Sequence, residues 1–244
     1  MQHMDSPQLQ PTFSIIDVLN GRIADPCLKK AARTELRLMK SLAQLLDKQS
    51  FNDIRNSDIC ANADLSYGVL NARFKDKRAL AIHLAEFYMV QLENSFQNST
   101  NGTAQDADGY LKVFDQIYYH LNCAQNNIGI WRLLSESSLL GDDIEAIYQR
   151  THNYWAKMLT DQLPERIGGK KTNAKEIELI GLSLSGMFDI VFIELLVKRR
   201  NGLDFPLETI AEWIALLRYR AIMGHDPDPE SVKRARRLAE DGNE

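Results

Sequence analysis

The sequence contains little that breaks helices and little that marks a secreted or membrane protein. Only 7 prolines and 13 glycines occur in 244 residues, and no tract is of low complexity, which excludes global disorder and collagen-like repeats. No apolar run reaches the length of about 18 residues that a bilayer requires, so we expect no membrane span. Residues 1–20 lack a basic start followed by an apolar run, so we expect no signal peptide.

Cysteines and catalytic motifs are scarce as well. Cys27, Cys60 and Cys123 lie far apart, which excludes a disulfide framework and a zinc knuckle and suits the reducing cytoplasm. The histidines are scattered and form no metal-binding pair: His3, His83, His120, His152 and His225. Neither the nucleophile motif G-x-S-x-G nor the phosphate loop G-x-x-x-x-G-K occurs. We therefore expect a cytoplasmic protein that is not an enzyme and that needs neither a metal nor a cofactor.

Charge is distributed unevenly along the chain. The whole sequence has 29 basic and 33 acidic residues and a formal net charge of -4. Residues 22–90 nevertheless contain 12 Lys and Arg against 8 Asp and Glu, so the acidic excess lies in the rest of the chain. A basic early segment on an acidic protein favours nucleic-acid binding by that segment.

Apolar residues recur at helical spacing through most of the chain, whereas strand signals are almost absent. The capping-box pair Asn173 and Glu176 marks the start of one helix, and Pro206 marks the start of another. The predicted long helices are 33–48, 77–97, 109–124, 142–162, 173–199, 206–223 and a highly charged one at 229–240. The pattern predicts an all-α protein with roughly nine or ten helices.

Segment 51–80 predicts two short helices joined by a tight turn. The first helix covers 56–62 and the second 67–74. Asp64 can make the bend because Asp tolerates a positive φ, and the Ser66 hydroxyl is placed to cap the second helix.

The second short helix has two different faces. Leu70 and Phe74, four residues apart, would anchor it from behind. The outward positions carry small or hydrogen-bonding side chains: Tyr67, Gly68, Asn71 and Ala72. This arrangement is a helix-turn-helix unit, which inserts its second helix into the major groove of DNA.

Residues 33–84, about a fifth of the chain, resemble the DNA-binding segment of the tetracycline-repressor (TetR) family of bacterial transcription regulators. The spacing from Phe51 through Ile59 to Phe74 fits the family pattern. The matching residues around the second short helix are Leu65-Ser66, Gly68, Leu70, Phe74-Lys75-Asp76-Lys77 and Ala79-Leu80.

The resemblance implies DNA contacts by Ser57, Ser66, Tyr67, Gly68, Asn71, Arg73 and Lys77. Tyr67, Gly68 and Asn71 would face base edges or the adjacent backbone, and Arg73 and Lys77 would meet phosphate. The chain departs from the family at three positions: Asn71 replaces a usual aromatic, Arg73 a frequent His, and Asp64 a usual Gly. Asn71 could read adenine bidentately, and Arg73 could take a phosphate or a guanine.

The resemblance also implies that the remaining helices bind a small-molecule effector and pair two subunits. The expected effector contacts are Phe114, Tyr118, Trp131, Trp155, Met158, Met187 and Phe188, with His120 and His152 as polar candidates. Ordinary core packing is the alternative for each of these aromatic and methionine residues. Segments 173–199 and 206–223 would pair subunits, because the first is apolar on most sides and slim in the middle.

The resulting domain prediction has four parts: an N-terminal extension at 1–31, a helix-turn-helix domain at 32–78, an effector-binding and dimerisation domain at 79–224, and a tail at 225–244. The expected function is that of a ligand-released repressor that binds a near-palindromic double-stranded DNA operator as a homodimer. Two alternatives stay open. One is a helical small-molecule carrier or enzyme that uses the aromatic region, and the other is a regulator or adaptor without an effector.

Overall fold

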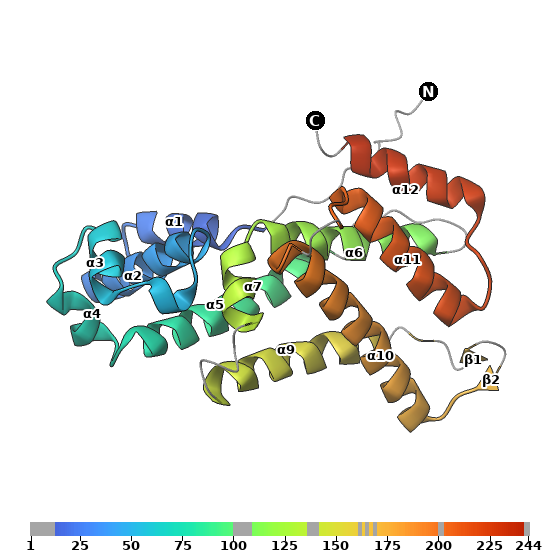
Figure 1. Ribbon diagram of the computed structural model, residues 1–244, viewed down its shortest axis with the longest axis horizontal. Coiled ribbons are helices and arrows are strands. Elements are labelled where there is room, and N and C mark those ends of the chain that lie inside the picture. The colour runs from blue at the N-terminus through green and yellow to red at the C-terminus, as the bar shows by residue number, and fades with distance from the viewer. Residues whose placement is uncertain are drawn as a thin grey trace. The chain divides into compact units, whose positions relative to one another are not determined.

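The computed structural model describes residues 13–99, 109–135, 142–160, 163, 166–167, 170–199 and 203–241. These residues are helical apart from connecting segments and a two-residue antiparallel pair, β1 (Arg166–Ile167) with β2 (Lys170–Lys171) (Figure 1). The prediction of an all-α fold is confirmed.

The chain divides into two compact units. We call Phe13–Ser95 together with Ala124–Thr151 the head unit. We call Met1–Thr12, Phe96–Cys123 and His152–Glu244 the body unit. Three helices, α5, α6 and α9, contribute residues to both units.

The head unit contains the segment that resembles a DNA-binding domain. Its elements are α1 (Ile15–Ala24), α2 (Lys30–Leu46), the 3-10 turn η1 (Phe51–Asp53), α3 (Asn56–Asn62), α4 (Gly68–Arg73), most of α5 (Lys77–Ser99), α7 (Ile128–Ser135) and the first half of α9 (Asp142–Thr160). Helix α1 lies in the predicted N-terminal extension and packs on α2. Fully buried apolar side chains from several helices form the core: Leu19, Leu38, Leu42, Leu46, Ile59, Leu70, Leu80, Leu84 and Tyr88.

A residue far along the chain fixes the start of α1. The Ile15 N–H donates to Asn127 Oδ1 at 2.7 Å, and Asn127 Nδ2 donates to the Phe13 carbonyl at 2.9 Å. Asn127 therefore satisfies a free N–H in the first turn of α1 and is itself buried at the same place.

The end of α2 is joined to the start of α7. The Gly129 N–H donates to Asp47 Oδ1 at 3.1 Å, and Arg132 donates to the Leu46 carbonyl at 2.9 Å. Burial raises the pKa of Asp47, while the Gly129 hydrogen bond and the Arg132 charge act in the opposite direction. A Cβ on Gly129 would lie 2.6 Å from the Asp47 nitrogen and 2.6 Å from the Leu46 carbonyl carbon, so only glycine allows this backbone approach.

The body unit contains most of α6 (Tyr110–Gln125), the second half of α9, α10 (Ala174–Phe192), α11 (Leu207–Met223) and α12 (Pro229–Asp241). A π-helical turn, Ile193–Val197, continues α10. The predicted capping box is present, because Asn173 Oδ1 accepts the Glu176 N–H at 3.0 Å and the Glu176 carboxylate accepts the Asn173 N–H at 2.9 Å. Gly224 ends α11 with a left-handed φ of 77°.

Helix α10 with its π turn, Ala174–Val197, has a mean hydropathy of 2.0 over a stretch of which only 17% is buried. By length and composition this helix could cross a membrane. The sequence itself predicts no membrane span, because it contains no apolar run long enough. A single helix of this kind is weak evidence for a membrane protein. Helix α10 also packs closely on α9 within the body unit. Asp189 lies 2.6 Å from His152 of α9, and a Cβ at Gly181 would collide with Thr160.

Candidate DNA-contacting face and ligand region

The turn between α3 and α4 has the predicted geometry. Asp64 has a φ of 52°, the left-handed conformation expected for it. The Leu65 N–H donates to the Cys60 carbonyl at 2.9 Å and closes the turn. Arg37 of α2 donates to the carbonyls of Ala63 and Asp64, so the bend is also held from outside the motif.

The predicted anchoring side of the motif is buried. Ile59 and Leu70 have no exposed surface, and Phe74 is half-buried with its ring 5.7 Å from that of His83. Ser41 of α2 donates to the Ile59 carbonyl at 2.7 Å, which fixes α3 on α2. Helix α4 is therefore held from behind by apolar contacts.

The opposite side of α4 is open. Tyr67 is 63% exposed, Asn71 is exposed, and no atom lies within 4 Å of a Cβ built on Gly68. Arg73 is exposed and lies 3.9 Å from Glu35 of α2, and Ser57 of α3 is exposed as well. The predicted contact residues at α4 are thus all accessible, and we refer to them together as the α4 outer face: Tyr67, Gly68, Asn71 and Arg73.

The predicted cap of α4 is wrong. The helix begins at Gly68 with Tyr67 as its capping residue, and no side chain makes the capping hydrogen bond. Ser66 is exposed and contributes its carbonyl, which accepts the Val69 N–H at 3.0 Å. Tyr67 already has helical backbone angles, so the first turn is closed by the Ser66 carbonyl, and the Ser66 hydroxyl makes no hydrogen bond within the described residues.

The Lys77 ammonium is bound by backbone carbonyls of the same chain. Its Nζ donates to the carbonyls of Phe51 and Ile54 at 2.8 and 2.6 Å and lies 4.3 Å from the centre of the Phe51 ring. Burial lowers the pKa of Lys77, and the charges of Asp53 and Asp58 oppose this. The ammonium therefore fastens the start of α5 to η1, and its contact with phosphate stays a prediction.

Sequence reasoning did not select Lys75, which follows α4 and is exposed. No ion pair or hydrogen bond of its side chain exists within the described residues. Arg78, by contrast, pairs with Asp143 at 3.1 Å. A free ammonium beside the α4 outer face is what a phosphate contact requires, and exposure is the property that the sequence alone does not give.

Most of the predicted effector residues lie in the body unit. Phe114 and Tyr118 of α6 are buried and stacked, with ring centres 5.7 Å apart. Trp155 of α9 meets the ring of His120 edge-on at 4.2 Å, and Phe188 of α10 lies 6.1 Å from the same ring. Helices α6, α9 and α10 thus place aromatic side chains around His120.

The other predicted effector residues are placed differently. Met187 of α10 is half-buried, and the Met158 side chain lies outside the described residues. Trp131 belongs to the head unit, where its Nε1–H donates to the Tyr88 hydroxyl at 2.9 Å.

Burial shifts the pKa of three groups in the body unit. It raises the pKa of Asp115 to about 6 and lowers that of Arg218 to about 10. Burial, with the Arg218 charge as a smaller cause, lowers the pKa of His120 to about 3, so His120 is neutral at physiological pH.

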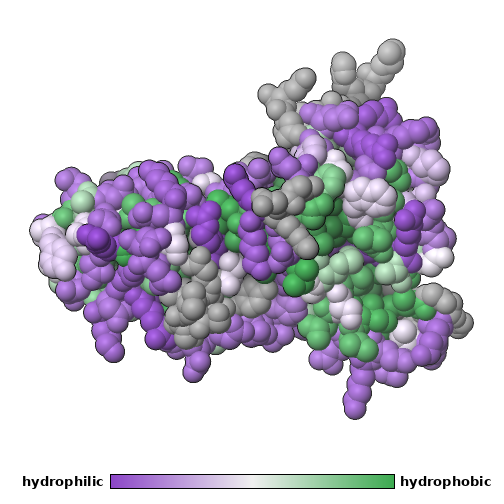
Figure 2. All heavy atoms as spheres, in the orientation of Figure 1, coloured by the Kyte–Doolittle hydropathy of each residue, from purple (hydrophilic) through white to green (hydrophobic). Residues whose placement is uncertain are grey.

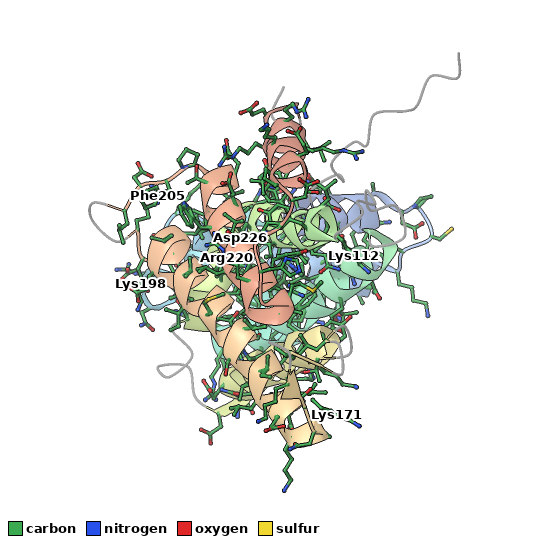
Figure 3. The ribbon with its side chains drawn as sticks, turned by 90° about the vertical axis from the view of Figure 1, so that its right-hand side faces the viewer. Lys112, Lys171, Lys198, Phe205, Arg220 and Asp226 are labelled. Carbon is green, nitrogen blue, oxygen red and sulfur yellow. The ribbon has the colours of Figure 1, made fainter. Side chains whose placement is uncertain are left out.

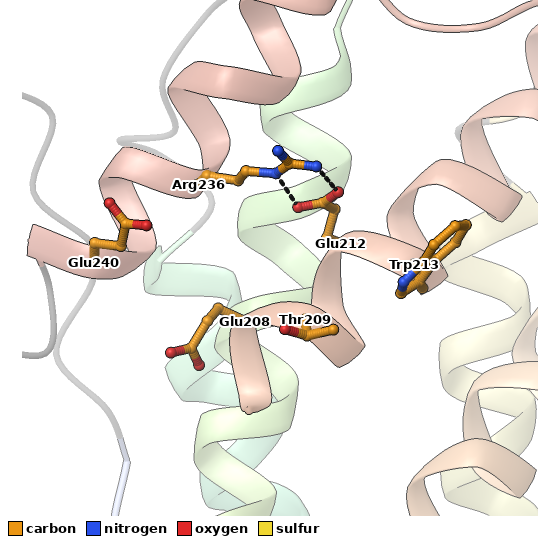
Figure 4. A pocket seen from close by; sticks show the side chains of 6 residues that line it. All are labelled: Glu208, Thr209, Glu212, Trp213, Arg236 and Glu240. Carbon is orange, nitrogen blue, oxygen red and sulfur yellow. Dashed lines mark hydrogen bonds and ion pairs between the residues drawn. The ribbon is translucent and has the colours of Figure 1, made fainter. Parts of the chain in front are cut away.

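A pocket of about 300 Å³ lies between α11 and α12 (Figure 4). Its lining is mainly acidic: Glu208, Thr209, Glu212, Trp213, Arg236 and Glu240. Arg236 is already neutralised by a two-bond contact with Glu212 at 2.5 and 2.6 Å. None of the predicted effector residues lines this pocket.

Helices α10 and α11 carry an uncovered apolar surface. Leu179 and Ile190 are each 63% exposed, and a Cβ on Gly186 would meet no atom within 4 Å. Trp213 and Leu217 of α11 are exposed as well. Figure 2 shows hydrophobic surface over these helices, and Figure 3 looks onto them with Lys198 and Phe205 labelled in the connection. We call this surface the α10–α11 face.

The sequence matches no model of a known protein family and no curated protein. Solved structures do match. A TetR-family transcriptional regulator from Streptomyces coelicolor aligns with a TM-score of 0.62 at 13% identity, over 86% of this chain and 90% of that one. A candidate transcriptional regulator from Pseudomonas aeruginosa aligns with a TM-score of 0.61 at 16% identity, over 90% and 99% of the two chains. The fatty acid degradation regulator FadR from Bacillus halodurans aligns with a TM-score of 0.58 at 16% identity, over 78% and 97%.

The geometry and the comparisons together define the fold. The chain is an all-helical protein with a helix-turn-helix motif in its head unit. Its particular fold is that of the TetR-family transcriptional regulators, as the resemblance of residues 33–84 led us to expect. The TM-scores of 0.58–0.62 show the shared fold, but at identities of 12–16% they show nothing more, so what this chain binds must be argued from its own residues.

Proposed function

We propose that this protein is a sequence-specific DNA-binding transcriptional regulator. The observation that carries the proposal is the α4 outer face, whose hydrogen-bonding side chains are exposed around the open position of Gly68, while Leu70 is buried on the back of α4. Such a helix can enter the major groove of B-DNA without rearrangement of its core.

The exposed side chains have distinct roles in this proposal. Asn71 has the amide that can bond adenine bidentately, and Arg73 can reach a guanine or a phosphate when it leaves Glu35. Lys75, which is exposed, would contact phosphate and set the strength of binding rather than its sequence preference. Ser57 and Ser66 would approach the DNA backbone.

DNA binding is tested by selecting an operator from random duplexes and comparing variants on it. Asn71→Ala should lower the affinity for the selected site by about 1–3 kcal/mol and relax preference at one base position. Asn20→Ala, which removes another exposed amide from the head unit, is the matched control and should change nothing. The proposal fails if no duplex is enriched, and the assignment of Asn71 fails if its variant selects the same site with equal affinity.

The phosphate contact has a separate signature. Lys75→Ala should weaken binding to all duplexes alike and reduce the slope of log affinity against log salt by about one unit. An unchanged slope would remove Lys75 from the interface.

We propose that two copies pair through the α10–α11 face. Contiguous exposed apolar side chains mark an interaction surface, and this face carries several of them. Gly186 leaves room for another helix to approach the α10 backbone closely. A two-fold dimer would present two α4 helices to successive major grooves about 34–36 Å apart, which requires a near-palindromic operator.

Sedimentation velocity tests the pairing. Leu179→Glu should shift the protein from dimer to monomer, whereas Glu178→Gln, at an exposed neighbouring position on α10, should leave the dimer intact. A wild-type protein that sediments as a monomer at micromolar concentration would contradict the pairing.

We further propose that a small-molecule effector releases the protein from its operator. An effector bound in the body unit can change DNA affinity only by binding one conformation of the protein more tightly than the other. We infer that the free protein binds the operator and that the effector weakens binding, as in a repressor. Equal operator affinities with and without a bound effector would exclude this part of the proposal.

A further inference from the structure

Two buried hydrogen-bond donors in the body unit have no partner within the described part of the chain. Arg218 Nε of α11 and Gln116 Nε2 of α6 are inaccessible to solvent, and neither has a hydrogen-bond acceptor among the residues that the structure describes. Arg218 also makes no ion pair with any carboxylate in the described part of the chain. Leaving such groups unsatisfied destabilises a folded protein, and the effect is largest for a charged group.

The two donors belong to one neighbourhood. Gln116 and His120 are one turn apart on α6 and therefore share a face of that helix. The ring of His120 also bonds the backbone of Gln116, and it feels the positive charge of Arg218. The aromatic rings of Trp155 and Phe188 adjoin His120 from α9 and α10.

The chemistry of this neighbourhood is specific. It offers a guanidinium whose Nε is shut off from solvent and one buried amide donor, both near aromatic side chains, and His120 adds no charge because it is neutral. A guanidinium presents its N–H groups in a planar fork that matches the two oxygens of a carboxylate. A single guanidinium balances one negative charge, which fits a carboxylate better than a doubly charged phosphate ester.

We propose that the body unit binds a monocarboxylic acid with an apolar remainder, whose carboxylate pairs with Arg218 and accepts a hydrogen bond from Gln116. The apolar remainder would lie against Trp155 and Phe188. This inference rests on the proposed function only in naming the acid as the effector, because binding of the acid can be measured without DNA.

The first test uses wild-type protein and matched probes. Decanoic acid and 3-phenylpropanoic acid are each compared with their primary amides by thermal shift and by quenching of tryptophan fluorescence. At least one acid should bind 10-fold or more tightly than its amide, because only the acid supplies the charge that Arg218 lacks. Equal binding of both acids and their amides, or no binding of either acid, would overturn the proposal.

The second test removes the charge. Arg218→Gln should abolish the preference for acid over amide, while Arg220→Gln removes an exposed arginine two residues away that already pairs with Asp226 and should keep the preference. An unchanged preference in Arg218→Gln would overturn the assignment. If Arg218→Gln does not fold, the comparison of acid and amide on wild-type protein decides the question alone.

A DNA readout separates the two proposals. If the acid binds and releases a selected operator, both stand. If the acid binds while no duplex is ever bound, the DNA-binding proposal fails and the carboxylate site stands. If DNA is bound and the acids and amides are equivalent, the carboxylate site fails and the regulator proposal stands.

Discussion

Replacing Arg218 by methionine should make the protein more stable. Burial lowers the pKa of Arg218 to about 10, which means that the charged form is less stable in the folded protein than in water. One pKa unit corresponds to about 1.4 kcal/mol, so the desolvated charge destabilises the fold by up to roughly 3 kcal/mol. Methionine keeps an unbranched apolar side chain and removes the charge. Replacing a buried charge by an apolar residue of similar volume often makes a protein more stable.

Thermal and urea unfolding of Arg218→Met measure this effect. Each kcal/mol gained should raise the Tm by about 2–4 °C in a protein of this size, and the gain should be the same at pH 6 and pH 8 because the guanidinium is charged at both. Arg220→Met is the matched control and should not raise the Tm, because Arg220 is exposed and paired. A fall in Tm for Arg218→Met would show that Arg218 stabilises the fold, and the argument for a missing anionic partner would be refuted.

Two further stability measurements test other parts of the structure. Gly129→Ala should destabilise the protein by at least about 1–3 kcal/mol in urea unfolding, because its Cβ would lie 2.6 Å from backbone atoms at the end of α2. Gly21→Ala, where the added Cβ meets no atom within 4 Å, should instead stabilise by up to about 1 kcal/mol, and a similar result for both variants would contradict the packing described. Asp115→Asn should gain stability over wild type as the pH rises from about 4 to 6, by up to roughly 3 kcal/mol. The reason is that burial raises the pKa of the folded carboxyl to about 6, so the wild type loses stability as that group ionises. His120 contributes equally to the pH dependence of both proteins, so its effect cancels in the difference. Parallel curves of unfolding free energy against pH for the two proteins would disprove the burial effect on Asp115.

Local sequence features predicted the helices and the turn of the motif, because helical periodicity and turn chemistry are read from neighbouring residues. The helix expected at 56–62 is α3, with the same limits. Asp64 adopts the left-handed conformation that its side chain tolerates, and Leu70 is fully buried, as its spacing from Phe74 indicated. Turn chemistry and helical periodicity act over a few residues, so one sequence is enough to read them.

Features that depend on distant partners could not be predicted in this way. The start of α1 is fixed by Asn127, more than 100 residues further on, and no local pattern indicates that contact. Lys77 looked like a free cation until the fold brought it beside the carbonyls of Phe51 and Ile54. The isolation of Arg218 is likewise a property of packing, because α11 alone shows only an arginine in an amphipathic pattern.

The hydrogen bonds from Arg37 to the bend at Asp64 limit how the α3–α4 segment can be transplanted. A left-handed backbone is less favourable for Asp than for Gly, so this turn depends on the guanidinium that reaches it from α2. A peptide that begins at Phe51 would lose that support and should populate other turn conformations. Grafting the motif onto another scaffold would therefore require α2 to be carried along, whereas a relative with Gly at position 64 could donate the shorter piece.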